Sequence, residues 1–149
     1  MTAPLSRAAF EAASGVSRET SDRLAAYLAV LRKWNRRINL VGASTLQDPW
    51  RRHLLDSIQL RAYLPSAPGT LVDLGSGAGL PGLPLAISTP QWSVSLIESD
   101  ERKAAFLREA ARATETRITV HAARIESVSP LGADIVTARA LASLENLLP

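Results

Sequence analysis

The segment LVDLGSGAGLPG at residues 71–82 constrains the fold of this 149-residue chain more than any other. An apolar run that predicts a buried strand carries one acidic residue, Asp73, near its end. It then breaks into glycines before a helix is expected to begin. Glycines let a backbone approach a ligand closely, and a helix N-terminus offers free N–H groups. The segment therefore predicts a site for a nucleoside or nucleotide-like cofactor at a strand tip.

The rest of the chain predicts helices first and then alternating strands and helices. A helix capped by Ser17 has an apolar face, and a second helix is expected to begin with Asp48 as N-cap and Pro49 as its first residue. After a Pro- and Gly-rich joint, strands are expected at 70–74, 93–97, 118–121 and 135–137, with helices at 81–88 and 101–113. This alternation predicts an α/β fold with a parallel sheet. We expect a basic helical module at 1–64 and a cofactor-binding domain at 65–149.

Composition excludes several classes of function. The chain has no cysteine, which excludes disulfides, thiolate zinc sites and a cysteine nucleophile. Its two histidines, His53 and His121, argue against a histidine-rich metal site. No apolar run approaches the ~20 residues that a membrane-spanning helix needs. Residues 1–64 hold ten Lys and Arg against five Asp and Glu, whereas the remainder is mildly acidic. The basic half is explained about equally well by contact with a polyanion and by a solvated, arginine-rich surface without a partner.

Polar residues also follow the other predicted strands, where an open parallel sheet binds its ligands. Glu98 follows the second strand, where an acidic residue can accept hydrogen bonds from both hydroxyls of a ribose. Ile125 and Glu126 follow the third strand and are placed to flank an adenine. Arg139 follows the fourth.

Two cofactors compete for the glycine segment. Residues 77–82 match the dinucleotide pattern G-x-G-x-x-G, but counting from Gly75 puts Leu80 where the third glycine should be. Asp73 would repel a pyrophosphate, whereas its carboxylate can hold the ammonium group of S-adenosylmethionine, directly or through water. The residues therefore favour this methyl donor over NAD and leave NAD as the alternative.

Four segments in one order resemble the small-subunit (16S) ribosomal RNA methyltransferase G family, also called glucose-inhibited division protein B. They are KWN with NL (33–35 and 39–40), RHLLDS (52–57), DLGSGAGLPGLPLA (73–86) and ARALASL (138–144). The resemblance implies a class I S-adenosylmethionine-dependent methyltransferase fold with an N-terminal helical extension. Family members normally continue past the length of this chain, so the remaining strands of the sheet are expected to be missing from it.

The resemblance further implies transfer of a methyl group to guanine N7 in 16S ribosomal RNA, either free or in the small ribosomal subunit, in the cytoplasm. Arg139 would lie near the methionine end of the donor and the incoming base, as the catalytic residue. The expected cofactor-binding residues are Asp73, Gly75, Gly77, Gly79, Leu80, Glu98, Ile125, Glu126 and Arg139. Two alternatives remain at this point: a catalytically impaired fragment that binds cofactor or RNA, and an NAD-dependent oxidoreductase.

Overall fold

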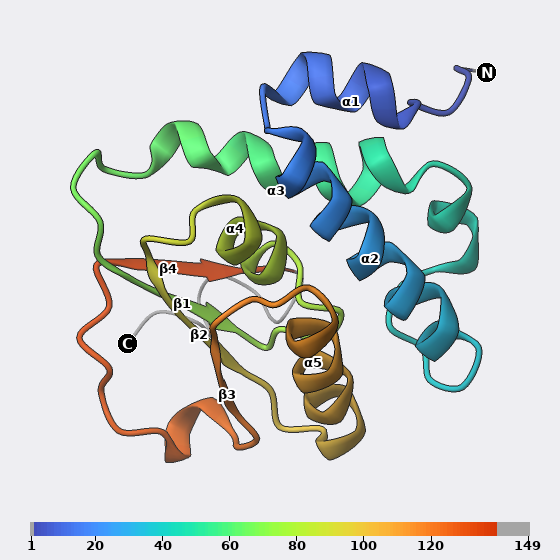
Figure 1. The fold of residues 1–149 in the computed structure, drawn as a ribbon. Helices are drawn as coiled ribbons and strands as arrows, with labels where there is room; N and C mark the ends of the chain where they lie inside the picture. Colours follow the sequence, from blue (N-terminus) through green and yellow to red (C-terminus); the bar gives the residue numbers. More distant parts are fainter. Residues whose placement is uncertain (1, 140–149) are drawn as a thin grey trace.

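Four parallel strands form the centre of the structure, a computed structural model that describes residues 2–139 (Figure 1). They are β1 (Thr70–Leu74), β2 (Ser93–Ile97), β3 (Thr119–His121) and β4 (Ile135–Ala138), in the spatial order β3-β2-β1-β4. The chain steps outward from β1 to β3 and then returns to β4 on the other side of β1. The connections therefore diverge at the carboxyl ends of β1 and β4, which is where sheets of this kind bind ligands. The predicted parallel α/β fold is confirmed.

Three helices pack in layers beside the sheet (Figure 1). Helices α4 (Gly82–Ser88) and α5 (Glu101–Ala113) connect successive strands, and the long α2 (Arg18–Asn35) packs against both. The Tyr27 hydroxyl on α2 is buried and donates to the Ala78 carbonyl in the glycine loop, 2.6 Å away. Burial raises the pKa of Tyr27, so the phenol keeps the proton that this hydrogen bond needs. The helical region and the sheet thus share one hydrophobic core.

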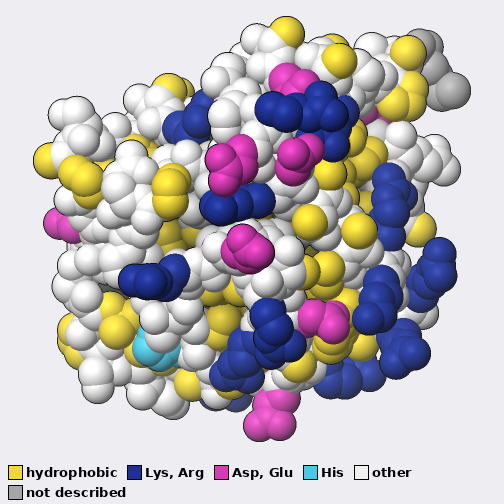
Figure 2. All heavy atoms as spheres, viewed as in Figure 1, with side chains coloured by type: hydrophobic (Ala, Val, Ile, Leu, Met, Phe, Trp, Pro, Cys, Tyr) yellow, Lys and Arg dark blue, Asp and Glu magenta, His cyan; other side chains and the backbone are white. Residues whose placement is uncertain are grey.

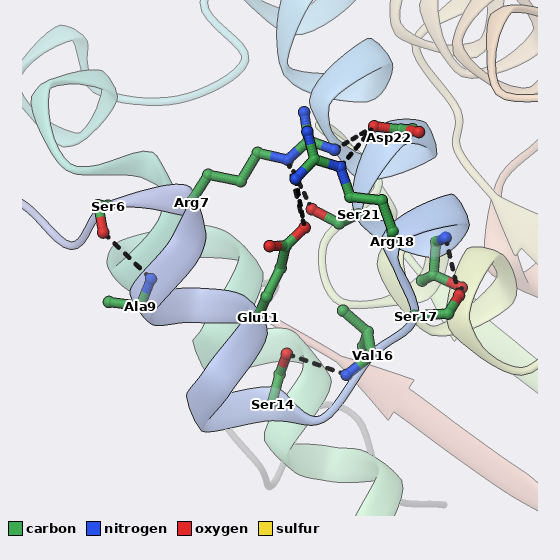
Figure 3. Close-up of polar contacts among 11 residues, drawn as sticks. Ser6, Arg7, Ala9, Glu11, Ser14, Val16, Ser17, Arg18, Ser21 and Asp22 are labelled. Carbon is green, nitrogen blue, oxygen red and sulfur yellow. Dashed lines mark hydrogen bonds and ion pairs between the residues drawn. The ribbon is translucent and has the colours of Figure 1, made fainter.

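Polar contacts join α2 to a short helix that the hydrophobic pattern did not predict, α1 (Arg7–Ser14) (Figure 3). Arg7 Nε donates to the hydroxyl of Ser21 at 2.7 Å, and the same guanidinium pairs with Asp22. The apolar anchor of α1 is Phe10, which is fully buried and packs against Trp50 with ring centroids 5.0 Å apart. A helix of 8 residues with one large apolar side chain is too short to give a repeated apolar pattern over the window that such a prediction needs.

The predicted second helix is present, but it winds in three ways. The 3-10 turn η1 (Ala43–Gln47) precedes it, and the helix itself consists of η2 (Trp50–Leu55, a π-helix), α3 (Asp56–Ile58) and η3 (Gln59–Tyr63, 3-10). The predicted start is confirmed: Pro49 is helical, and the non-helical Asp48 before it accepts the N–H of Arg52 on its carbonyl at 2.9 Å, although its side chain caps no helix N–H. The Asp48 carboxylate instead accepts the backbone N–H of Leu5 at 2.8 Å and pairs with Arg51. Asp48 thus ties the N-terminal segment to this helix.

The remaining predicted elements agree with the structure within about a residue. Ser17 caps α2 by accepting the backbone N–H of Thr20 at 3.1 Å, as predicted. The bounds predicted for β1, β2 and α5 match, whereas β3 begins one residue later and β4 ends one residue later than expected. Most of the fourth segment of the family resemblance, from residue 140 onward, lies outside the described residues. Within residues 2–139, no helix combines the length and the apolar character needed to cross a membrane.

Candidate cofactor site

The carboxyl ends of all four strands open into one cavity of about 750 Å³. Its walls come from each strand tip in turn and from the helical region. They comprise 75–78 and Leu80 after β1, 97–99 at the end of β2, 123–126 after β3, Arg139 after β4, Lys103 on α5, and 40–42 with His53 from the helical region. This volume lies within the range of small-molecule sites in proteins, roughly 300–1,000 Å³. The sheet topology therefore brings residues from opposite ends of the chain to one site.

The glycine loop after β1 turns by means of left-handed backbone conformations. Gly75 and Gly77 have φ angles of +60° and +54°, which L-residues with side chains rarely adopt. Both line the cavity, with Leu80. Gly79 (φ +81°) is also left-handed, but it is buried and does not line the cavity. A Cβ there would lie 2.9 Å from Leu107 Cδ2, so the lack of a side chain at Gly79 lets the loop pack on α5.

Glu98 holds the glycine loop and faces the cavity. One carboxylate oxygen, Oε1, accepts the backbone N–H of Gly77 at 2.7 Å, and Oε2 accepts that of Asp100 at 2.8 Å. Only 7% of the residue is exposed. A carboxylate has about four acceptor positions, so each oxygen keeps capacity for one further donor. Glu98 is therefore oriented by the backbone and still able to accept two hydroxyl groups.

Asp73 lies behind the loop and is not part of the cavity wall. It is 1% exposed, and its Oδ1 accepts the Thr137 hydroxyl at 2.7 Å. Oδ2 is buried without a hydrogen-bond partner among residues 2–139. Burial raises the pKa of Asp73 to about 6. A contact between Asp73 and a cofactor stays a prediction.

The raised pKa of Asp73 predicts a pH-dependent stability. Near pH 4 the carboxyl of the folded state keeps its proton, but between pH 4 and 6 the carboxyl in the unfolded state ionises. The free energy of unfolding should therefore fall through this window by about 3 kcal/mol at most, the value that follows from 1.36 kcal/mol per pKa unit. Asp73→Asn cannot ionise, so in urea titrations it should gain stability relative to the unchanged chain between pH 4 and 7. A stability difference independent of pH would contradict the prediction.

Arg139 and His53 meet at the part of the cavity next to the helical region. The Arg139 Nη2 lies 3.6 Å from Asp56 Oδ2, and because both side chains are well exposed this ion pair contributes little to stability. His53 is 4% exposed, and burial, followed by the charges of Arg139 and Arg52, lowers its pKa to about 4. His53 is thus a neutral imidazole in the cavity wall at neutral pH.

Seven of the nine expected cofactor residues line this cavity: Gly75, Gly77, Leu80, Glu98, Ile125, Glu126 and Arg139. Asp73 and Gly79 stand behind it. Residues 40–42 and His53 were not predicted to line the site, since nothing local ties them to a loop more than 20 residues further on. The signal that could have found them is the family resemblance, which covers residue 40 and residues 52–57.

Among residues 2–139, no three His, Asp or Glu side chains gather where they could hold a metal ion.

A parallel sheet of this order, with a glycine loop after β1 and an acidic residue after β2, agrees with the class I methyltransferase fold and is shared with dinucleotide-binding domains. The family model described as rRNA small subunit methyltransferase G matches residues 20–148. The chain therefore belongs to the rRNA small subunit methyltransferase G family.

Curated relatives agree with this assignment. The chain is 60% identical to the ribosomal RNA small subunit methyltransferase G of Rhodospirillum rubrum over 141 residues, covering 94% of this chain and 69% of the relative. It is 62% identical to the protein of the same name from Rhodospirillum centenum over 151 residues, covering 100% of this chain and 69% of the relative. The chain thus spans about two thirds of the length of these relatives.

Proposed function

We propose that this protein transfers the methyl group of S-adenosylmethionine to N7 of a guanine in 16S ribosomal RNA, a reaction of the cytoplasm. The observation that carries the proposal is the cavity itself: in a chain of this family, one cavity joins all four strand tips and exposes the backbone-held carboxylate of Glu98. S-adenosylmethionine is a nucleoside joined to an amino acid. It needs a hydrogen-bond acceptor for the ribose in the middle of the site, apolar contact for the adenine at one end and polar groups for the amino acid at the other.

The residues present fit the methyl donor. Glu98 has two free acceptor positions for the ribose hydroxyls, and the half-buried Ile125 offers apolar contact to an adenine face. At the other end, Gly75 brings bare backbone to the cavity wall. The Oδ2 of Asp73 is buried and has no hydrogen-bond partner within residues 2–139. This oxygen can accept a hydrogen bond from the ammonium group of the donor, directly or through water. A pyrophosphate in the same place would bring two negative charges toward this carboxylate, so NAD fits less well.

The proposed reaction requires no proton transfer by the protein. The donor supplies a methyl group on a sulfonium sulfur, and guanine N7 has a free lone pair at neutral pH. No general base is needed, so alignment of the two groups and exclusion of water can provide most of the rate enhancement. The neutral His53 and the buried Asp73 are therefore not required as bases. Arg139 stands at the cavity where it can donate hydrogen bonds to guanine O6 or steer a phosphate.

Exposed arginines near the cavity support an RNA substrate. Within the described part of the chain, Arg32, Arg36 and Arg37 are exposed at the end of α2 and form no ion pair with a carboxylate. Figure 2 shows Lys and Arg side chains gathered at the right of the molecule, where α2 lies in Figure 1. Arg37 precedes the cavity-lining Leu40 by three residues, a stretch of chain that reaches about 10 Å when extended. RNA phosphates held there would lie close to the cavity rim.

Isothermal titration calorimetry with S-adenosylhomocysteine, the product of the proposed reaction, tests the function directly. We expect saturable binding of one molecule per chain and no binding of NADH under the same conditions. Methyl transfer is then measured with tritiated donor and small-subunit RNA, with the product nucleoside identified as 7-methylguanosine. Binding of NADH without binding of S-adenosylhomocysteine would refute the proposal. Donor binding without methyl transfer would favour an impaired fragment.

A further inference from the structure

A three-residue segment of the helical region, residues 40–42, forms one wall of the cavity. We call it the strap. It belongs to no helix or strand, so its backbone groups must find partners outside regular secondary structure. The side chains of Asn35 and Thr45 supply partners from both sides of the strap, and neither residue lines the cavity. Two backbone bonds add to them, from the Leu40 N–H to the Ile38 carbonyl at 3.1 Å and from the Thr45 N–H to the Gly42 carbonyl.

Asn35, the last residue of α2, holds the first half of the strap. Its single side-chain oxygen, Oδ1, accepts the backbone N–H of Leu40 at 2.9 Å and that of Val41 at 3.0 Å. Both N–H groups are partly buried. An amide oxygen has two lone pairs, so this pair of bonds uses its full capacity and ties the start of the strap back to the end of α2, five residues earlier.

Thr45 and His53 hold the other end of the strap. The Thr45 hydroxyl donates to the Gly42 carbonyl at 2.6 Å, and the Thr45 backbone N–H donates to the same carbonyl at 3.0 Å. Since the only hydroxyl proton is used on Gly42, the contact of 2.7 Å between Thr45 Oγ1 and His53 Nε2 requires His53 to be the donor. A neutral imidazole with its proton on Nε2 meets this requirement. The chain of bonds therefore runs from His53 through Thr45 to Gly42.

We propose that Asn35 and Thr45 are positioning residues for the methyl donor: they hold the strap as a wall of the cavity and touch the donor only through it. This inference rests on the proposed function and extends it to residues outside the cavity. The strap contributes the half-buried side chains of Leu40 and Val41 to the core and the cavity wall. Releasing either end leaves that wall mobile, so the donor must order it on binding and binds more weakly.

Two substitution pairs of matched shape test the inference on the full chain. Thr45→Val removes the hydroxyl with little change in volume, whereas Thr45→Ser keeps it. Asn35→Leu removes the acceptor oxygen, whereas Asn35→Asp keeps it. We expect the Kd for S-adenosylhomocysteine to rise about tenfold in Thr45→Val and Asn35→Leu, which corresponds to about 1.4 kcal/mol. Thr45→Ser and Asn35→Asp should stay within about twofold of the unchanged chain. Ser44→Ala, at an exposed neighbour of Thr45, is the control.

Kinetics separate positioning from a merely structural role. With small-subunit RNA, the KM for the donor should rise about tenfold in Thr45→Val while the KM for RNA stays unchanged. General destabilisation would instead lower the melting temperature and the binding stoichiometry, and leave the Kd of the folded fraction as it was. An unchanged Kd in Thr45→Val and Asn35→Leu would overturn the strap proposal alone. Absence of S-adenosylhomocysteine binding in the unchanged chain would overturn the proposed function, and the strap proposal with it.

Discussion

Replacing Glu98 with alanine is expected to weaken the binding of S-adenosylhomocysteine by at least about a hundredfold. The carboxylate combines two tasks. It would accept the two ribose hydroxyls, and hydrogen bonds to a charged group contribute about 1.5–3 kcal/mol each. It also accepts the N–H groups of Gly77 and Asp100, so its removal leaves two backbone donors without a partner and releases the glycine loop. A hundredfold loss corresponds to about 2.7 kcal/mol, which the ribose contacts alone can account for.

Two further variants make the Glu98 test specific. Glu98→Gln keeps one acceptor oxygen of the same reach, so its Kd should fall between those of the unchanged chain and Glu98→Ala. Glu126→Ala removes an exposed carboxylate that also lines the cavity but accepts no backbone N–H among the described residues, and should change the Kd by no more than a few fold. Calorimetry gives all three values, and circular dichroism checks the fold. Equal effects of Glu98→Ala and Glu126→Ala would contradict the role assigned to Glu98.

Replacing Arg139 with alanine is expected to lower the turnover number for RNA methylation about a hundredfold while changing the Kd for S-adenosylhomocysteine less than fivefold. Arg139 lies at the cavity next to the switch point between β1 and β4, and it is exposed enough to meet an incoming base or phosphate. Removing one preorganised hydrogen-bond donor from an active site costs about 10²–10³ in turnover. The protein should remain folded, because the only ion pair of Arg139 within the described residues is the exposed one with Asp56.

Asp56→Asn is the matched control for Arg139. It breaks the same ion pair but leaves the guanidinium in place, so turnover should stay within about threefold of the unchanged chain. Single-turnover assays with excess enzyme report the chemical step separately from product release. If Arg139→Ala and Asp56→Asn reduced turnover equally, the ion pair itself would be the important feature. If Arg139→Ala left turnover unchanged, Arg139 would have no place in the active site.

Short-range patterns in the sequence were sufficient to predict the strands and helices of the sheet domain. The apolar runs at β1 and β2 and the periodicity of α5 predict their bounds correctly, because burial on one or both faces leaves a clear signal over a few residues. The Ser17 cap was also predictable, since it involves residues only three apart. Helix α1 was not predicted, because its one large apolar side chain, Phe10, packs on Trp50, 40 residues further along the chain. The π-helical winding at residues 50–55 was not predicted either.

Spacing in the sequence grouped the residues that line the cavity but did not set the boundary of the cavity. The alternation of strands and helices places the residues after each strand at one edge of the sheet, so the sequence alone groups Gly75, Glu98 and Arg139. Which side chains face the cavity depends on how the loops pack. Gly79 is used for packing against Leu107, and Asp73 is enclosed behind the loop.

The glycine segment, Glu98 and the hydrophobic alternation were enough to predict the class of fold and a nucleoside cofactor, because these signals lie within single βα units. The wall built by the strap, its support from Asn35 and Thr45, and the neutral state of His53 were decided only in the folded molecule. They arise where the end of α2, η1 and the π-helical segment come together at the cavity. The bonds that hold the strap join residues three to eight apart, but its place against the glycine loop, more than 20 residues further on, is set by the packing of the common core, which no local pattern encodes.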